Sequence, residues 1–266
     1  MTNEGWRDAV AAGTPPAPVV LVLGGFITSP PMYRGLTRRL LARGAADVIV
    51  GNVWTPDWLL AAARGLGPIV TRSGRALLAA SARSGELALG APVLVVGHSA
   101  GGLSARLLTS PVPFQGRTLN ASGRIGAIVT LGTPHVVAEE GSGGRRVGAL
   151  AAQLINREAP GPAFAPTTGY LAVASRYRTG RRDGARAERR TWRIYQGLTA
   201  TDAPEIDGDE LIPLSCALLP GAPSLVLDDA AHGQGLGRDW YGSDRFVDRW
   251  WPLAVAAWHE ALRARL

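Results

Sequence analysis

The chain has 266 residues, enough for one large α/β domain but short for two ordinary domains. Apolar residues make up 46% and charged residues 18%, which excludes wholesale disorder and predicts a globular protein. The net charge is +7 and every basic residue is an arginine. Because these arginines are not interleaved with aromatic residues, as in nucleic-acid-binding modules, we expect no nucleic-acid partner.

Cys216 is the sole cysteine, so no internal disulfide can form, and its apolar neighbours predict a small buried side chain. The first 18 residues lack the basic and apolar regions of a signal peptide. No run reaches the ~18 apolar residues of a membrane span. We therefore expect a cytoplasmic protein without a transmembrane segment.

Strands and helices alternate in the first half of the chain. Continuous apolar runs predict buried strands, and leucines and alanines at helical spacing predict helices. Because parallel strands need crossover connections, the alternation predicts an α/β fold with a mostly parallel central sheet and helices on both faces. The expected elements are a strand at 19–23, a helix at 33–44, a strand at 48–53, a short and a longer helix within 59–89, a strand at 93–96, a helix opening at Ser99 and a strand at 125–131.

The pattern loosens after Pro134, which predicts a small cap- or lid-like insertion at about 136–168 within a single domain of residues 1–266. A flexible polar stretch at 139–146 precedes a short helix at 149–157. The apolar side chains of the insertion either line an acyl pocket or pack beneath a loop, and the sequence favours neither. They are Leu150, Leu154, Ile155 and Phe164.

Residues 170–175 and 225–227 predict two further strands, and 244–266 predicts a final amphipathic helix. Between the two strands, residues 176–190 carry seven arginines against Asp183 and Glu188. Such a stretch is usually a solvated surface loop, which is the interpretation we favour. The alternative is a patch that meets an anionic lipid or substrate.

Ser99 is the candidate nucleophile. It stands in Gly97-His-Ser-Ala-Gly-Gly102, between a predicted strand and a predicted helix. A sharp strand-to-helix turn strains the backbone at its corner and needs small neighbours, which Gly97 and Gly101 provide. The segment fits the G-x-S-x-G nucleophile elbow, in which the serine is held exposed above the sheet.

A serine hydroxyl needs a base to take its proton and an acid to orient that base. Of the four histidines, His98 belongs to the elbow and points away from the serine. His232 follows the last predicted strand, where an open α/β sheet keeps its site, so we expect it to be the base. For the acid we prefer Asp209, with Asp207 as the open alternative.

Two backbone N–H groups are expected to form an oxyanion hole. One belongs to Ala100, directly after the nucleophile, and the other to Phe26, in the loop that follows the first strand. Gly24 and Gly25 let that loop come close to the serine.

Taken together, these motifs resemble the α/β-hydrolase superfamily, in particular its lipase-like serine esterases. The resemblance rests on Gly24-Gly-Phe26, the elbow at 97–102, Gly132-Thr-Pro-His135 and Gly208-Asp-Glu-Leu-Ile-Pro213, which occur in the family's order. The tail Trp240-Tyr-Gly-Ser243 is similar to a plant and cyanobacterial subgroup. Two departures stand out: Gly24 replaces the usual histidine of the oxyanion loop, and Glu210 replaces the glycine after the acid.

The resemblance implies hydrolysis of carboxylic esters through Ser99, His232 and Asp209 and an acyl-enzyme, with no metal or organic cofactor. The expected partner is a small-molecule or lipid ester, with peripheral lipid contact as an option and the oligomeric state open. Two alternatives stay: a hydrolase of the same fold that cleaves thioester, lactone or amide bonds, and a non-catalytic binding protein that retains the fold.

Overall fold

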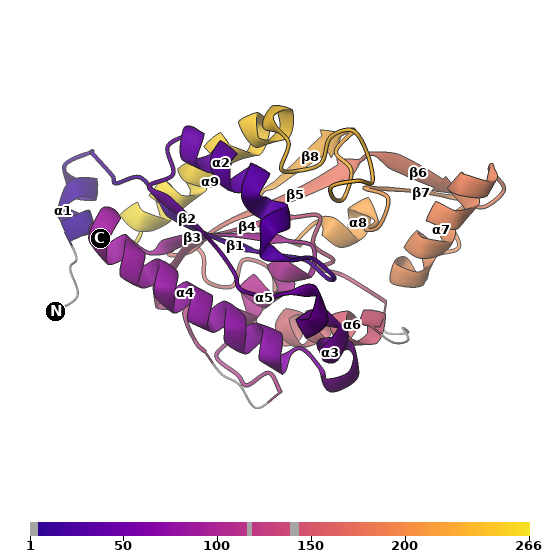
Figure 1. Cartoon of the computed structure of the whole chain (residues 1–266), viewed down its shortest axis with the longest axis horizontal. Coiled ribbons are helices and arrows are strands. Elements are labelled where there is room, and N and C mark those ends of the chain that lie inside the picture. Colours follow the sequence, from indigo (N-terminus) through magenta and orange to yellow (C-terminus); the bar gives the residue numbers. More distant parts are fainter. Residues whose placement is uncertain (1–4, 116–118, 139–143) are drawn as a thin grey trace.

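The computed structural model describes residues 5–115, 119–138 and 144–266. Within these residues the central sheet has six strands in the order β2-β1-β3-β4-β5-β8, and every neighbouring pair is parallel (Figure 1). The mostly parallel sheet expected from the sequence is therefore confirmed. The strands are β1 (Val19–Leu23), β2 (Asp47–Val50), β3 (Val93–His98), β4 (Ile125–Leu131), β5 (Gly169–Arg176) and β8 (Ser224–Asp228).

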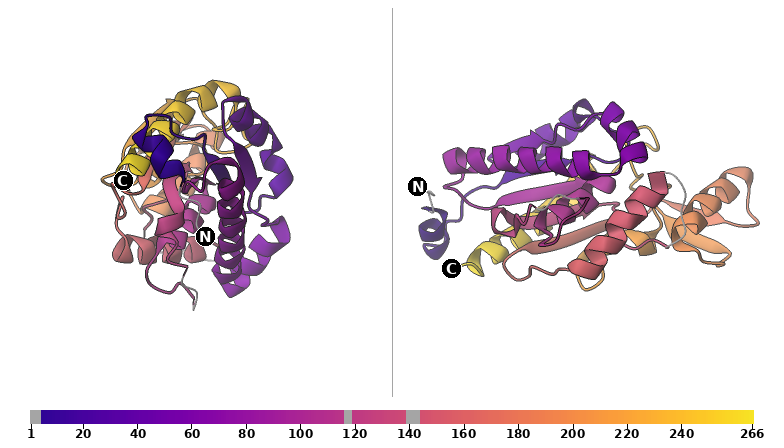
Figure 2. Two further views of the ribbon diagram at one scale, coloured as in Figure 1. Left: turned by 90° about the vertical axis from the view of Figure 1, so that its left-hand side faces the viewer. Right: turned by 90° about the horizontal axis from the view of Figure 1, so that it is seen from below.

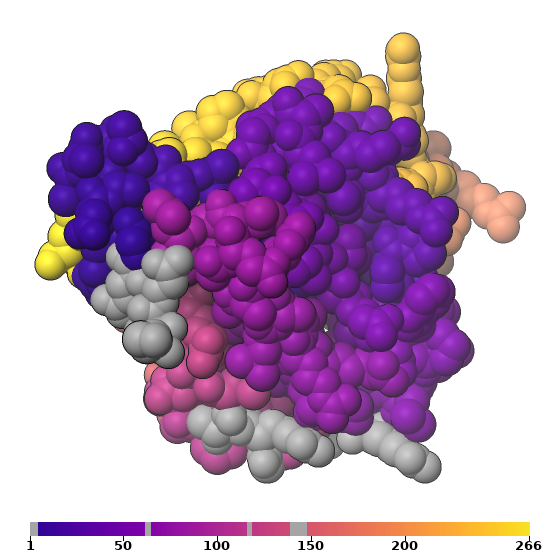
Figure 3. Space-filling model, turned by 60° about the vertical axis from the view of Figure 1, so that its left-hand side comes forward, coloured from indigo at the N-terminus to yellow at the C-terminus, as the bar shows by residue number. Residues whose placement is uncertain are grey.

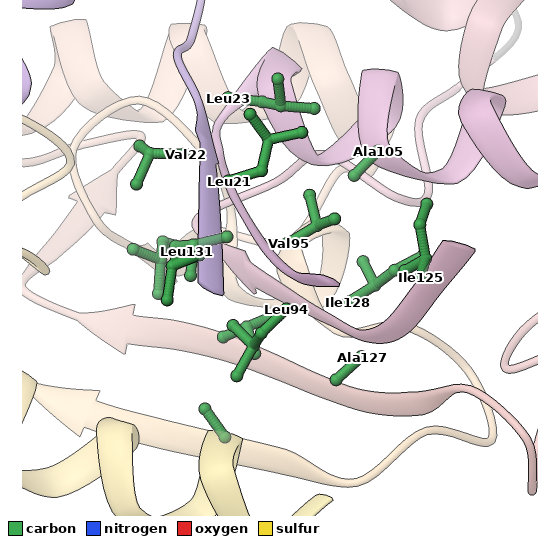
Figure 4. Close-up of a cluster of buried hydrophobic side chains, with 14 of the residues drawn as sticks. Leu21, Val22, Leu23, Leu94, Val95, Ala105, Ile125, Ala127, Ile128 and Leu131 are labelled. Carbon is green, nitrogen blue, oxygen red and sulfur yellow. The ribbon is translucent and has the colours of Figure 1, made fainter. Parts of the chain in front are cut away.

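The central strands are apolar on both faces because helices cover both sides of the sheet. All residues of β1, β3 and β4 are buried. Side chains from these strands, among them Leu21, Val95 and Ile128, pack with Ala105 of the adjoining helix in one continuous core (Figure 4). The predicted strand at 48–53 is shorter in the structure, because pairing with β1 ends at Val50.

Helices α4, α5 and α6 lie on one face of the sheet, and α2 and α9 lie on the other (Figure 2). The short helix α3 joins the first group, and α6 provides the connection between the neighbouring strands β4 and β5. The helices are α2 (Arg34–Ala42), α3 (Thr55–Arg64), α4 (Gly67–Leu87), α5 (Ala100–Thr109), α6 (Gly144–Glu158), α8 (Leu214–Ala217) and α9 (Asp244–Arg263), with short 3₁₀ turns at Pro30–Tyr33 and Ser122–Arg124.

The arginine-rich stretch 176–190 is not a loop, and our prediction was wrong there. It contains β6 (Arg178–Arg181) and the start of α7 (Arg186–Thr199), and β6 pairs antiparallel with β7 (Glu205–Gly208). The three elements pack together and project beyond the carboxyl end of the central sheet (Figure 1, Figure 2). They therefore stand on the side of the molecule where strands of an open sheet present their functional loops.

The two ends of the described chain meet at the opposite side of the molecule. In the space-filling view the N-terminal helix α1 (Gly5–Ala11), in indigo, lies against the end of α9, in yellow (Figure 3). Among the described residues, none of the helices combines the length and apolar character needed to span a bilayer. Cys216 is buried in α8, as expected, and burial raises the pKa of its thiol to about 11.

Candidate active site

The turn between β3 and α5 holds Ser99 in a strained conformation. Its φ is 53° and its ψ is −127°, a backbone region that is costly for a residue with a side chain. A Cβ atom at Gly97 would lie 2.4 Å from Gly102 Cα, and one at Gly101 would lie 2.1 Å from the carbonyl oxygen of Leu23. Both positions therefore exclude any side chain. Thr133, in the loop after β4, holds the elbow in place, because its hydroxyl donates to the Ser99 carbonyl at 2.9 Å.

His232 and Asp209 are joined by a buried hydrogen bond. His232 Nδ1 donates to Asp209 Oδ2 over 2.8 Å, and the backbone N–H of His232 donates to the Asp209 carbonyl at 2.9 Å. A carboxylate only accepts, so the proton of the neutral imidazole sits on Nδ1 and the lone pair on Nε2. His232 and Ser99 line the same cavity. Among the described residues, Ser99 Oγ makes no hydrogen bond, neither to His232 nor to any other side chain.

Both side-chain oxygens of Asp209 accept hydrogen bonds from buried donors. The backbone N–H groups of Leu211 and Ile212 donate to Oδ1 at 3.1 and 2.8 Å. The hydroxyl of Tyr241 donates to Oδ2 at 2.9 Å. Burial, and next the charge of Asp209, raise the pKa of Tyr241 well above its usual value, so this tyrosine keeps its proton. The carboxylate is thereby fixed in position and stays able to orient His232.

The loop after β1 brings two glycines against the serine. A Cβ atom at Gly25 would lie 2.7 Å from Ser99 Cβ, so the backbone approaches Ser99 as closely as a glycine permits. Within the described part of the chain, the N–H groups of Phe26 and Ala100 donate to no other residue. The structure thus leaves the two N–H groups that we expected in an oxyanion hole without an internal acceptor.

Tyr33 explains the departure at Gly24. A side chain at position 24 would come within 2.8 Å of the Tyr33 ring, and the Tyr33 hydroxyl accepts the Gly25 N–H at 3.0 Å. The loop is therefore braced by a tyrosine from the following 3₁₀ turn. The same hydroxyl lies 2.8 Å from His98 Nδ1, so the brace continues into the elbow.

His98 connects the oxyanion loop with the loop that carries His232. Its Nε2 lies 2.7 Å from the carbonyl oxygen of His232 and must donate, because a carbonyl only accepts. Burial, and next the nearby His232, lower the pKa of His98 to about 3, so the ring is neutral and its Nδ1 accepts from Tyr33. Both ring nitrogens of His98 are thus used by Tyr33 and His232.

Several residues considered for the site lie elsewhere. Asp207 accepts a hydrogen bond from the hydroxyl of Thr179 at 2.6 Å and does not meet His232. His135 is fully buried and lies 2.9 Å from the Thr130 hydroxyl. Asp209 is thus the carboxylate that the structure brings to His232, and Asp207 belongs to the two-stranded β6–β7 sheet.

An apolar cavity of about 610 Å³ opens in front of Ser99. Of the four apolar side chains weighed for an acyl pocket, Leu154, Ile155 and Phe164 pack with the core, and Leu150 is exposed. The start of α6 reaches the cavity through Gly148 and Ala149 instead; residues 139–143 lie outside the described residues. Among the described apolar side chains that line it are Phe26, Met32, Trp58, Leu66, Leu103, Val137, Ile194, Leu198 and Leu236.

Sequence reasoning missed the roles of Tyr33 and Tyr241. Tyr241 belongs to the Trp-Tyr-Gly-Ser motif that we noted without giving it a role, and Tyr33 belongs to no motif. Within the described ranges, the structure shows no group of three or more histidine, cysteine or carboxylate side chains arranged to hold a metal ion.

Comparison with solved structures identifies the architecture. The mature lipase BlEst2 of Bacillus licheniformis superposes with a TM-score of 0.60 at 14% identity over 92% of this chain and 93% of that chain. Est1E from Butyrivibrio proteoclasticus with ferulic acid bound (TM-score 0.47, 13% identity, 93% and 89% covered) and the monoacylglycerol lipase of Paleococcus ferrophilus (0.48, 11%, 92% and 97%) are also similar. No family model and no curated protein sequence matches the chain.

The chain has the α/β-hydrolase fold. In an α/β-hydrolase the nucleophile, acid and histidine follow in that chain order, on loops at the carboxyl ends of the strands. Here Ser99 follows β3, Asp209 follows β7 and His232 lies in the loop after β8. The β6–α7–β7 unit stands between the sheet strand β5 and the loop of Asp209.

Proposed function

We propose that the protein is a serine hydrolase of carboxylic esters. Ser99 Oγ attacks the ester carbonyl while His232 Nε2 takes its proton. The C–O bond of the tetrahedral intermediate then breaks, and His232 returns the proton to the leaving alkoxide. Water, activated by the same histidine, releases the acyl group from Ser99. Asp209 holds the imidazole and stabilises its cation, and the N–H groups of Phe26 and Ala100 bind the oxyanion.

The hydrogen bond from His232 Nδ1 to Asp209 carries this proposal. It leaves the lone pair of His232 Nε2 available as a general base in the same cavity as the hydroxyl of Ser99. A protein that uses the fold for binding alone needs neither this bond nor the strained elbow. The similarity to a lipase structure supports the fold, and the activity is argued from the site alone.

The apolar lining of the cavity supports an ester with an apolar acyl chain. We also propose that segment 136–168 acts as a small cap, because the start of α6 contributes to the cavity wall.

A series of p-nitrophenyl esters from acetate to palmitate tests the proposal. We expect Ser99→Ala to lower turnover on the order of 10⁶-fold and Asp209→Asn on the order of 10⁴-fold, because the second change leaves the histidine in the wrong tautomer. Asp207→Asn is the matched control, since its carboxylate bonds Thr179, and we expect turnover close to that of the wild type.

Circular dichroism and melting curves must show that each variant is folded. Hydrolysis that survives Ser99→Ala contradicts the proposal, and so does equal loss of activity in the two aspartate variants. Turnover of thioesters or amides but of no ester would assign a different bond to the same site.

A further inference from the structure

Five arginines line a second cavity, of about 850 Å³, next to the apolar one. Four of them come from α7 at spacings of three and four residues, which puts them on one face of the helix. The fifth comes from β6. They are Arg178, Arg186, Arg189, Arg190 and Arg193.

These arginines lack the anionic partners that their neighbours have. Arg181 forms ion pairs with Glu188 and Glu205. In the part of the chain that the structure describes, none of the five cavity arginines forms an ion pair. Like charges at this spacing disfavour a helix, and so do cations in its first turn, where the helix dipole is positive. The four arginines of α7 are exposed, so solvent screens part of their repulsion, and a bound anion would remove the rest.

Glu210 is a second unusual feature of this cavity. Its φ is 91°, a conformation that a glycine adopts freely and that strains a residue with a side chain. Its Oε2 atom is buried and has no hydrogen-bond partner. Glu210 directly follows Asp209, so the chain runs from the wall of the arginine cavity straight into the proposed triad.

The two cavities share a wall. Ile194, Leu211 and Leu236 line both of them. Because the two cavities adjoin, a molecule that spans both would place an apolar chain in front of Ser99 and a charged group among the arginines. Five guanidinium groups against one carboxylate favour an oxyanion of more than one charge, and the guanidinium fork suits phosphate oxygens. Glu210 lines the arginine cavity, and a carboxylate there suits a hydroxyl donor close to the phosphate.

We infer that the substrate is an acyl ester of a phosphorylated polyol, with its phosphate in the arginine cavity. This inference rests on the proposed ester hydrolysis and names its substrate class. The reaction consumes one water and yields the fatty acid and the phosphorylated alcohol. Only the acyl C–O bond breaks, so the phosphate binds and does not react.

The test compares 1-hexanoylglycerol with 1-hexanoylglycerol 3-phosphate, which share the scissile ester and stay monomeric at this chain length. We expect wild-type kcat/KM to be higher for the phosphorylated ester. Arg190→Gln and Arg193→Gln should each lower this preference about tenfold, because each removes a charged donor to phosphate. Arg182→Gln is the control: it lies in the same arginine-rich stretch, pairs with Asp183 and is not among the arginines of the cavity, so the preference should not change.

Calorimetric binding of the ether analogue, 1-O-hexylglycerol 3-phosphate, separates the two proposals. Binding that depends on Arg190 and Arg193 without hydrolysis of either ester would overturn ester hydrolysis and leave the anion site standing. Hydrolysis that depends on Ser99 with equal kcat/KM on both esters would overturn the anion site alone.

Two further arms identify the source of the phosphate. Inorganic phosphate that binds as tightly as the ether analogue would assign the cavity to a free anion and overturn the substrate proposal. Binding to phosphatidylserine vesicles without a preference for the monomeric phosphorylated ester would assign the arginines to a membrane surface and overturn it as well.

Discussion

At the scale of single residues, His98 is a buried titratable group that forms no ion pair within the described residues. It lies between the Tyr33 hydroxyl and the His232 carbonyl, and these contacts use both ring nitrogens of the neutral form. Protonation would put a second proton on Nδ1, where Tyr33 donates. The network therefore depends on a neutral ring, as does the position of the loop that carries His232.

This arrangement predicts that stability falls in acid. Burial lowers the pKa of His98 to about 3 from the 6.5 of an exposed histidine. Between these values the unfolded chain binds a proton that the folded protein does not, so the folded state loses stability as pH falls from 6.5 toward 3. The loss from His98 reaches at most about 1.4 kcal/mol per pH unit. Urea unfolding from pH 7 to pH 4 measures it.

Two variants separate proton linkage from lost contacts. His98→Gln removes the titrating group, so the slope of unfolding free energy against pH should become shallower by about one proton. Tyr33→Phe breaks the same network without changing a group that titrates in this range, so it should lower stability and leave the slope unchanged. Identical slopes in His98→Gln and the wild type would contradict the assignment.

The residues that the sequence brought forward are those with a local signature. Ser99 stands in a glycine-bounded turn, and His232 directly follows a strand. Tyr33 belongs to no motif, and the motif of Tyr241 does not indicate its role. The partners of these tyrosines lie 65 and 32 residues away along the chain. Their roles follow from tertiary contacts alone.

At the scale of elements, the β6–α7–β7 unit is where sequence reasoning failed. The strands of the main sheet are apolar on both faces, so composition alone predicts them. Strand β6 reads Arg-Thr-Gly-Arg, with no alternation of polar and apolar residues. Helix α7 buries a narrow face around Thr191 and Tyr195. Polar elements that pack mainly on one another have no apolar pattern in the sequence, so they are easily taken for a loop.

Gly180 sets how closely β6 and α7 pack. A Cβ atom there would lie 2.5 Å from the backbone nitrogen of Trp192, and backbone atoms have little room to yield. We therefore expect Gly180→Ala to lower the free energy of unfolding by about 1–3 kcal/mol, as overpacking does. Denaturant unfolding measures the change.

Gly123→Ala is the matched control, because a Cβ atom at position 123 has no neighbour within 4 Å. It should leave the free energy of unfolding close to that of the wild type. A Gly180→Ala protein as stable as this control would show that β6 and α7 move apart without cost.

At the scale of the whole molecule, the fold was predictable because a parallel sheet both orders the strands and gathers the functional loops. Carboxyl ends of parallel strands meet at one edge, so loops distant in sequence converge there. Ser99 and Asp209 are 110 residues apart by number and reach one site through this convergence. The opposite edge has no motif in the sequence, so the contacts that hold the two ends of the chain were not predictable.

Arg265 fastens that opposite edge. Its guanidinium donates to four carbonyl oxygens, those of Ser122, Gly123, Ile125 and Thr167, at 2.6 to 3.1 Å. These carbonyls flank the starts of β4 and β5, so the last turn of the molecule ties α9 to the two central strands. Burial, and next Arg7, lower the pKa of Arg265, but the group keeps its charge at neutral pH.

Removing this clamp should weaken the whole domain and not only its end. We expect Arg265→Ala to lower the free energy of unfolding by about 2 kcal/mol, because the carbonyls lose a charged donor that solvent replaces only in part. Arg263→Ala is the control, since within the described ranges the side chain of Arg263 forms no hydrogen bond or ion pair. If both variants melt together with the wild type, the C-terminal turn frays independently of the sheet. If Arg265→Ala alone melts early in a single cooperative transition, the end of the chain is part of the core that holds the distant site in place.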